Sequence, residues 1–327
     1  MPVPDIDPLT HLAIKHGTDK WGEHFYTPVY HDLFRDIRLE KLRVLEIGIG
    51  GFGLRDFGGE SLRMWAEYFP NARIVGIDIH QKNLALPASV RCERGSQSDL
   101  AFLKRLVDGH GPFDIVVDDG SHRPDDMLAS FGFLFPRMSE RGIYVIEDTQ
   151  TAFMPKWGGS QNGAKLLNFI AAMVQSLHRA EIRVEVPAYE PAEHLRDVKS
   201  VRAVHNLLIV EKGDNSQPSI FRFDAGHPEA QFALRSIAQR MRDDPNPACY
   251  ARYATLMHHA GRPDEAFAAI EAGLELWADE PGLLMAGFDI AKARGDTGRA
   301  RGYIERVKAR SSDPMIGGLL ASVEPRR

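Results

Sequence analysis

The sequence predicts an α/β fold with a doubly wound, mostly parallel sheet, followed by a small all-α region. Between residues 41 and 150 short apolar runs alternate with helix-like segments, which is typical of parallel strands joined by crossover helices. After about Gly213 no convincing strand follows, and the chain repeats itself instead. With 327 residues, of which 43% are hydrophobic and 26% charged, the chain can form one large domain and a smaller one.

Five short apolar runs are the expected parallel strands: Arg43–Gly48, Arg73–Asp78, Val90–Arg94, Phe113–Val117 and Gly142–Ile146. The helices expected between them, on both faces of the sheet, are Ser61–Phe69, Asp99–Val107 and Asp125–Arg137. Later in the chain we expect a helix at Ala164–His178 and two further strands, Ile182–Val186 and Asn206–Glu211. The first forty residues are expected to be helical.

The C-terminal region repeats with a period of 34 residues. Three pairs of identical residues show it: Pro247 and Pro281, Gly261 and Gly295, and Ala266 and Ala300. Paired helices, a turn glycine and a proline after the second helix resemble the tetratricopeptide repeat, and the alternative is a generic pair of helical hairpins. About two repeats are fewer than a free-standing solenoid needs, so we expect them to dock on the sheet domain or on another subunit.

Four segments follow from this organisation. They are an N-terminal helical lid (1–40), the sheet domain (41–213), a linker with a helix (214–245) and the tetratricopeptide-like repeats (246–327).

Composition excludes several classes of function. The net charge of −5 and pI near 6.2 give no electrostatic basis for binding nucleic acid or a membrane. The two cysteines, Cys92 and Cys249, are far apart and lack metal-type spacing, which indicates a reducing compartment without a disulfide framework or zinc site. The N-terminus does not resemble a signal peptide, and no apolar run approaches the roughly 20 residues that span a bilayer. We therefore expect a cytoplasmic protein.

The first strand runs into a glycine-rich turn, LEIGIGGFG. Gly48, Gly50 and Gly53 satisfy the dinucleotide pattern G-x-G-x-x-G, which is weak without its context. In dinucleotide-binding folds the helix opens at those glycines, but here it is postponed to about Ser61. The carboxylate of Glu46 would also repel a pyrophosphate, and it suits a ligand that carries positive charge.

The ends of the next two strands are polar as well. Asp78 closes the second strand, where an acid can accept hydrogen bonds from ribose hydroxyls. The third strand leads into polar residues that include Gln97, where an adenine can be held. The combination suits S-adenosylmethionine, whose sulfonium is positive, and a nicotinamide-dependent oxidoreductase remains the alternative.

Two acidic clusters follow the fourth and fifth strands. Asp118 and Asp119 precede His122, and Glu147 and Asp148 follow the next strand. Ligands in open α/β sheets bind at those strand ends, so the clusters are expected to face one pocket. Clustered carboxylates repel unless a cation neutralises them, and oxygen ligands without cysteine indicate Mg²⁺ or Ca²⁺. An imidazole there suits proton removal near neutral pH, although Asp118 can equally serve only the turn.

Five segments carry a resemblance to a known family: GTDKWGEHFYTPVY, LEIGIGGFG, GGESLRMW, GPFDIVVDDGSH and RGIYVIEDTQTA. In order and spacing, from about residue 10 to residue 160, they resemble the sugar O-methyltransferases of antibiotic biosynthesis, which act on macrolide or polyketide glycosides. The resemblance implies a class I methyltransferase fold that uses S-adenosylmethionine and Mg²⁺. By position it implies Asp119, Glu147 and Asp148 as metal ligands and His122 as the general base. The repeat region has no counterpart in it.

The expected reaction moves a methyl group from S-adenosylmethionine to a sugar hydroxyl. Two neighbouring hydroxyls would bind Mg²⁺, His122 would take a proton, and the oxygen would attack the methyl carbon. Asp118 is expected to help position the cofactor. A catechol also offers adjacent oxygens and stays an alternative acceptor, and a non-catalytic scaffold whose repeats bind a partner is a third possibility.

Aromatic residues near both ends of the sheet domain are expected to contact the sugar. Trp21, His24 and Tyr26 belong to an N-terminal polar–aromatic cluster, and Trp157 lies in a glycine-containing loop. The alternative for the N-terminal cluster is a capping helix whose aromatics are buried against the sheet. A homo-oligomer, formed with the help of the C-terminal repeats, is also expected.

Overall fold

The structure is a computed structural model that describes residues 6–215, 225–311 and 313–323. The chain divides into two compact units, the first comprising residues 1–182 and 186–215 and the second the remainder. The division after residue 215 lies close to the predicted boundary at residue 213. Most of the predicted linker DNSQPS, from residue 216 onward, lies outside the described residues.

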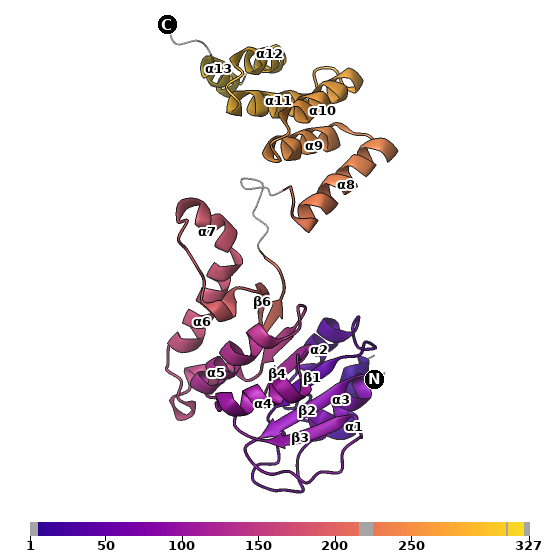
Figure 1. The fold of residues 1–327 in the computed structure, drawn as a ribbon, viewed down its shortest axis with the longest axis vertical. Coiled ribbons are helices and arrows are strands. Elements are labelled where there is room, and N and C mark those ends of the chain that lie inside the picture. The colour runs from indigo at the N-terminus through magenta and orange to yellow at the C-terminus, as the bar shows by residue number, and fades with distance from the viewer. Residues whose placement is uncertain (1–5, 216–224, 312, 324–327) are drawn as a thin grey trace, which may run out of the picture. The chain divides into compact units, whose positions relative to one another are not determined.

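A seven-stranded sheet forms the centre of the first unit, with the order β3-β2-β1-β4-β5-β7-β6. Figure 1 labels β1 to β4 and β6 of this sheet, with helices beside them. The first five strands are parallel: β1 (Arg43–Ile47), β2 (Arg73–Asp78), β3 (Val90–Arg94), β4 (Ile115–Asp118) and β5 (Ile143–Ile146). Two antiparallel strands complete it: β6 (Val198–Val204) and β7 (Leu207–Lys212). The predicted α/β class and the mostly parallel sheet are confirmed.

One predicted strand is wrong. Ile182–Val186 alternates apolar and charged residues like a strand, but α7 (Arg179–Glu185) is a helix there. The strand next to β7 is β6, which the sequence analysis missed. β6 lies at the sheet edge and carries Lys199 and Arg202 among its apolar residues, so its hydrophobic signal is weak. Asn206, at a φ of 60°, makes the tight turn into β7.

Helices cover both faces of the sheet, and two hydrophobic cores result. One face packs against three helices: α1 (Pro8–His16), α2 (Thr27–Phe34) and α3 (Glu60–Tyr68). The other face packs against three more: α4 (Leu100–His110), α5 (Pro124–Leu134) and α6 (Ala164–Leu177). Side chains alternate between the two faces along each strand, so Val116 belongs to the second core and its neighbour Val117 to the first.

The second unit is helical throughout its described residues. Its helices are α8 (Pro228–Asp243), α9 (Pro247–His259), α10 (Pro263–Leu276), α11 (Pro281–Ala293), α12 (Thr297–Lys308) and α13 (Pro314–Ala321). The 34-residue period has a structural basis, because each repeat is a pair of packed helices with a glycine at a φ of 72° after its first helix. Ala266 and Ala300 are both fully buried. Assignment to the tetratricopeptide family stays a prediction.

None of the helices in the described part of the chain is both long and apolar enough to cross a bilayer.

Candidate active site

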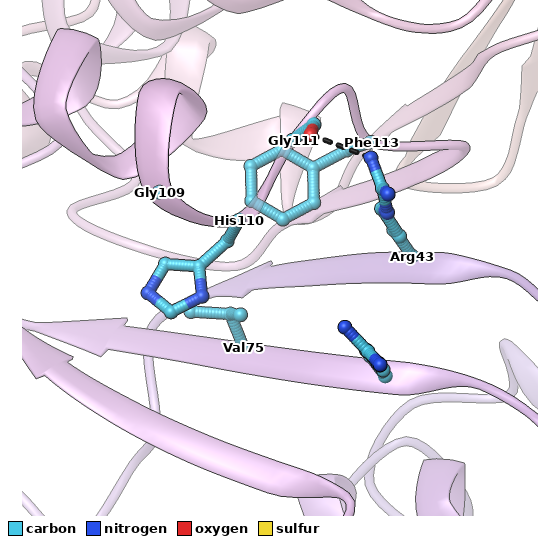
Figure 2. Close-up of a pocket in the computed structure, with 7 residues that line it drawn as sticks. Arg43, Val75, Gly109, His110, Gly111 and Phe113 are labelled. Atoms are coloured by element: carbon cyan, nitrogen blue, oxygen red, sulfur yellow. Dashed lines mark hydrogen bonds between the residues drawn. The ribbon is translucent and has the colours of Figure 1, made fainter.

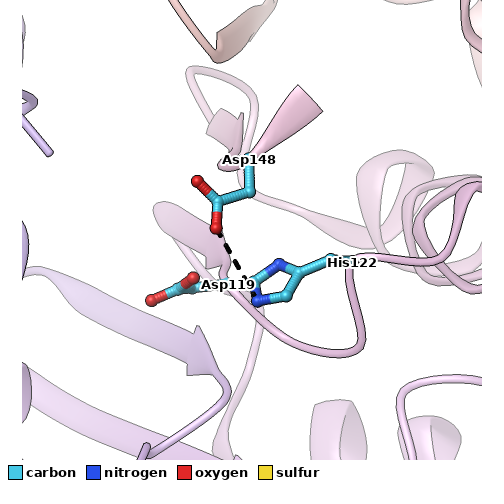
Figure 3. Close-up of side chains that lie close together, drawn as sticks. All are labelled: Asp119, His122 and Asp148. Carbon is cyan, nitrogen blue, oxygen red and sulfur yellow. Dashed lines mark ion pairs between the residues drawn. The ribbon is translucent and has the colours of Figure 1, made fainter. Parts of the chain in front are cut away.

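Three of the predicted site residues meet at the carboxyl end of the sheet. Asp119 directly follows β4, and Asp148 lies two residues beyond the end of β5. With His122, they offer ligand atoms that all lie within 4.8 Å of one another (Figure 3). Because β4 and β5 are parallel neighbours, their carboxyl ends lie side by side, and this brings the two acidic clusters together.

His122 and Asp148 are held in an unusual backbone conformation. Their φ angles are 56° and 53°, in the left-handed region that non-glycine residues rarely adopt. Such positions cost on the order of 1–3 kcal/mol each and cluster at functional sites. The Nε2 atom of His122 lies 3.8 Å from the Asp148 carboxylate, whereas its Nδ1 atom is buried without a hydrogen-bond partner. This buried Nδ1 atom has an unused hydrogen-bonding position, which a proton or a bound molecule could fill.

The N-terminal segment supplies one hydrogen bond to Asp148, and a residue after β5 supplies another. The hydroxyl of Tyr26 donates to the carboxylate at 2.7 Å, Gln150 donates at 3.2 Å, and His24 lies 3.6 Å away. Burial acts to raise the pKa of Asp148, but the hydrogen bonds from Tyr26 and Gln150, with the nearby His122, hold it below its usual range. Asp148 is therefore ionised at neutral pH, as a cation ligand must be.

Lys20 is the main residue that the sequence analysis missed. Its fully buried ammonium lies 2.8 Å from Asp119, 2.8 Å from Glu147 and 3.4 Å from Glu46. Burial acts to lower the pKa of Lys20, but the three carboxylates outweigh it and raise that pKa well above its usual range. In the sequence, Lys20 is marked only by its place in the polar–aromatic segment GTDKWGEHFYTPVY, and nothing in that segment predicts that its ammonium is buried among acids.

Lys20 lies beside two acids that were predicted to contact ligands, Glu46 for the cofactor and Glu147 for the metal. The carboxylate of Glu46 is fully buried, lies 3.4 Å from the Lys20 ammonium and accepts from Ser61 and Trp65, so the chain itself provides a positive partner for it. Glu147, 2% exposed, accepts from Lys20 and from the Tyr30 hydroxyl at 2.5 Å. It is not among the three residues whose ligand atoms converge.

One ammonium does not neutralise this many acids. Burial raises the pKa of Glu46 to about 7, although Lys20 acts to lower it. Burial and Asp119 raise the pKa of Glu147 well above its usual range, again against Lys20. With Asp148 the site brings four carboxyl groups around one buried lysine, and the raised pKa values mean that Glu46 and Glu147 retain protons more readily than ordinary carboxyls when no further cation is bound. The carboxylate oxygens of Asp119 and Asp148, which converge beyond the carboxyl ends of β4 and β5, fit a divalent cation.

Asp118 and Gln97, both predicted to bind the cofactor, lie inside the protein instead. Asp118 is 1% exposed and accepts from Gln97, Ser130 and Tyr144 at 2.9, 2.6 and 2.9 Å. Burial raises the pKa of Asp118 to about 6 against these hydrogen bonds. Gln97 also accepts from the backbone amide of Ser121, so the pair fixes the turn that carries Asp119 and His122. Both side chains therefore have internal hydrogen-bond partners, and their predicted contact with the cofactor stays a prediction.

The glycine-rich turn remains open to a ligand. Gly48 has a φ of 93°, and a Cβ there would lie 2.0 Å from the carbonyl oxygen of Asp119, so only glycine fits. Gly50, at a φ of 70°, faces open space. The following helix begins only at Glu60, as the sequence predicted, so no helix N-terminus is available to hold a pyrophosphate. Asp78 is half-buried at the end of β2, near the same turn, and accepts from the amides of Ile49 and His80.

The four side chains predicted to contact the sugar have different surroundings. Trp157 meets the His122 ring edge-on at 5.5 Å, so its loop reaches the site. Tyr26 is 3% exposed, with only its hydroxyl directed to Asp148, and Trp21 packs partly buried on the core. His24 stacks on Tyr26 at 4.9 Å and stays partly exposed. Tyr26 is therefore the only buried residue of the four, and Trp21, His24 and Trp157 are each partly exposed.

A small pocket lies at the other end of the strands, where β1 and β2 begin (Figure 2). Arg43 and Arg73, which line it, begin β1 and β2, and Phe113 precedes β4. Arg43 donates to the carbonyl of Gly111 across its rim. Ligands of open α/β sheets bind at the carboxyl ends of the strands, so this pocket is separate from the candidate site.

Comparison with known proteins agrees with this geometry. No protein-family model matches the chain. A tetracenomycin rhamnosyl 3′-O-methyltransferase of Streptomyces olivaceus is 40% identical over 217 residues, covering 65% of this chain and 55% of the relative. Mycinamicin VI 2″-O-methyltransferase of Micromonospora griseorubida is 39% identical over 216 residues, covering 65% and 54%. The predicted resemblance to sugar O-methyltransferases of antibiotic biosynthesis is confirmed.

A solved structure decides the fold. The methyltransferase MycE from the mycinamicin pathway, in complex with Mg and SAH, matches with a TM-score of 0.61 and 37% identity, covering 65% of this chain and 55% of that one. This chain carries the class I methyltransferase fold. In that methyltransferase fold, the glycine-rich turn and the acidic clusters lie along one edge of the sheet. The chain spans about half the length of the curated relatives it matches.

Proposed function

We propose that this protein is an S-adenosylmethionine- and Mg²⁺-dependent O-methyltransferase that acts on a sugar hydroxyl. The observation that carries the proposal is the convergence of Asp119, His122 and Asp148 at the carboxyl edge of a class I methyltransferase sheet. The relatives support the acceptor class, because their names describe O-methylation of rhamnosyl tetracenomycin and of mycinamicin VI. The delayed helix after Gly50 counts against a nicotinamide cofactor.

Asp119 and Asp148 are proposed to hold Mg²⁺. Glu147 is proposed to support them, with one carboxylate oxygen engaged by Lys20 and Tyr30. When bound, the cation would favour the alkoxide form of an acceptor hydroxyl, and S-adenosylmethionine would supply the methyl group. Gly48, Gly50 and Asp78 are proposed to line the cofactor site.

His122 is proposed to remove the acceptor proton. Asp148 lies 3.8 Å from its Nε2 atom and stabilises the imidazolium that forms. Trp157 restricts the ring from one side, and His24 and Trp157 are proposed to contact the sugar. Tyr26 orients Asp148, a different role from the stacking that the sequence analysis expected of it.

A cytoplasmic location, an oligomer formed through the tetratricopeptide-like repeats, and the division into segments 1–40, 41–213, 214–245 and 246–327 stay predictions.

A calorimetric titration with S-adenosylhomocysteine tests the class of enzyme. Run with Mg²⁺ and again after EDTA treatment, it is expected to give one-to-one binding in the presence of Mg²⁺. Methyl transfer to rhamnosyl and macrolide glycosides would then be assayed, with a catechol as the competing acceptor. No binding in either condition would overturn the proposal, and reduced nicotinamide cofactors would be titrated next.

Replacing His122 by alanine is expected to reduce methyl transfer by about 10²–10⁴-fold, because a positioned base contributes that much to a proton transfer. Affinity for S-adenosylhomocysteine should stay close to that of the wild type, since the imidazole faces Asp148. His110→Ala, at the opposite edge of the sheet, is the matched control and should retain activity. Wild-type turnover by the His122 variant would show that another group takes the proton.

A further inference from the structure

The ammonium of Lys82 lies among four backbone carbonyls of the loop that follows β1. It donates to Gly50 at 2.5 Å, Phe52 at 2.9 Å, Leu54 at 3.1 Å and Phe57 at 3.2 Å. Lys82 is 6% exposed, although it belongs to one of the most strongly hydrated residue types.

Four carbonyl oxygens that converge on one point repel one another unless a cation lies between them. Backbone carbonyls surround hard cations in this way, and here the cation is a side chain of the same chain. The loop's large apolar side chains contribute little packing, because Phe52, Leu54 and Phe57 are 87%, 62% and 55% exposed. Loss of the ammonium would therefore leave the loop with few internal supports.

The loop also has backbone supports, including a bond from the amide of Gly59 to Ile49 at 2.8 Å that joins its two ends. The amide of Leu54 donates to Gly51 at 3.1 Å, and the amide of Asn83 donates to Arg55 at 2.8 Å. Neither involves any of the four carbonyls that Lys82 bonds. Lys82 therefore adds four contacts between the loop and the segment that follows β2, beside the single backbone bond from Asn83.

We propose that Lys82 is a positioning residue for S-adenosylmethionine, which it serves by fixing the 50–57 loop at the carboxyl edge of the sheet. The inference rests on the proposed function. Lys82 lies four residues beyond Asp78 and its ammonium bonds the carbonyl of Gly50, so it ties together the two sides of the proposed cofactor site. It is remote from the proton transfer that His122 is proposed to perform.

Lys82→Met retains the aliphatic stem and removes the charge. Affinity for S-adenosylhomocysteine is expected to fall about ten-fold or more, because the variant must order the loop when the ligand binds. The KM for S-adenosylmethionine should rise to a similar degree, while kcat at saturation changes by less than about three-fold. Lys104→Met, an equal substitution at an exposed helical position that pairs with Asp108, is the control and should bind like the wild type.

Hydrogen exchange provides a readout that does not depend on the ligand. In Lys82→Met the amides of residues 50–58 should exchange faster, while those of β4 and β5 and the affinity for Mn²⁺ stay as in the wild type. Lys82→Arg retains donors and charge and should recover part of the affinity if the methionine variant folds poorly. Unchanged exchange in the loop, unchanged ligand affinity, or a fall in kcat alone would overturn the inference. Wild-type protein that binds no S-adenosylhomocysteine would instead overturn the proposed function.

Discussion

Lys20→Met is expected to lower the free energy of unfolding by about 3–5 kcal/mol, the cost of removing one partner from a buried ion pair. The variant would leave Glu46, Asp119 and Glu147 without the ammonium that lies 2.8–3.4 Å from each of them. Chemical denaturation of both proteins, with the midpoint and slope compared, measures the loss. Lys15→Met is a matched control, because Lys15 is 58% exposed and its pair with Glu67 should contribute no more than about 1 kcal/mol.

The loss should also depend on pH. Burial already raises the pKa of Glu46 to about 7, and Lys20 acts to lower it, so removing Lys20 raises it further. A carboxyl whose pKa is raised in the folded state binds its proton more tightly there than in the unfolded chain. Its contribution is greatest below the unfolded pKa, about 4.3, and is lost as pH rises through the folded value. The difference between wild type and Lys20→Met should therefore grow as pH rises through about 7, where Glu46 of the wild type loses its proton while that of the variant retains it. A pH-independent loss as small as that of Lys15→Met would contradict the buried-pair interpretation.

Asp119→Asn is expected to have the largest effect on activity. The amide matches the carboxylate in size but removes one of the two acids proposed to hold Mg²⁺, so methyl transfer should fall about a thousand-fold or more. Titration with Mn²⁺ by calorimetry should show a parallel loss of cation affinity, while affinity for S-adenosylhomocysteine in EDTA stays near that of the wild type. Lys20 retains Glu46 and Glu147 as partners, so the fold should persist.

Two controls separate a metal ligand from a general loss of acidity. Asp125→Asn removes an exposed carboxylate from the same segment, where it pairs with Lys165, and should change neither activity nor cation affinity. Asp118→Asn changes the adjacent carboxyl, which accepts three internal hydrogen bonds, and should lower stability by about 1–3 kcal/mol with cation affinity retained. The metal assignment fails if Asp119→Asn binds Mn²⁺ as the wild type does.

Local patterns in the sequence were sufficient for most of the fold. The five parallel strands and the helices between them appear where apolar periodicity predicted them, since each buried strand must present a short apolar run. The exceptions have a physical reason. The edge strand Val198–Val204 needs little apolar surface, whereas Ile182–Val186 has strand-like alternation but continues the helical region that starts at Ala164.

The adjacent acids Asp118 and Asp119, at the end of β4, show what a local pattern predicts and what it leaves open. Successive residues at a strand end point to opposite faces, so Asp118 shares the face of Val116 and turns into the core beside Tyr144. Asp119 comes to lie with Lys20 and Asp148. The alternation of side chains along the strand can be read from the sequence. The Ser130 and Tyr144 hydroxyls that donate to Asp118 come from α5 and β5, and only the folded chain brings them there.

The sequence by itself determined that the acids, His122 and the glycine-rich turn lie along one edge, because the carboxyl ends of parallel strands share an edge of their sheet. Only the tertiary structure decided which of the acids face outward and which face an internal cation. Lys20 reaches Asp119 across 99 residues and Glu147 across 127, and Lys82 gathers carbonyls from up to 32 residues away. A lysine in a local pattern reads as a solvated charge, and its burial becomes favourable only when the folded chain brings several oxygens around its ammonium.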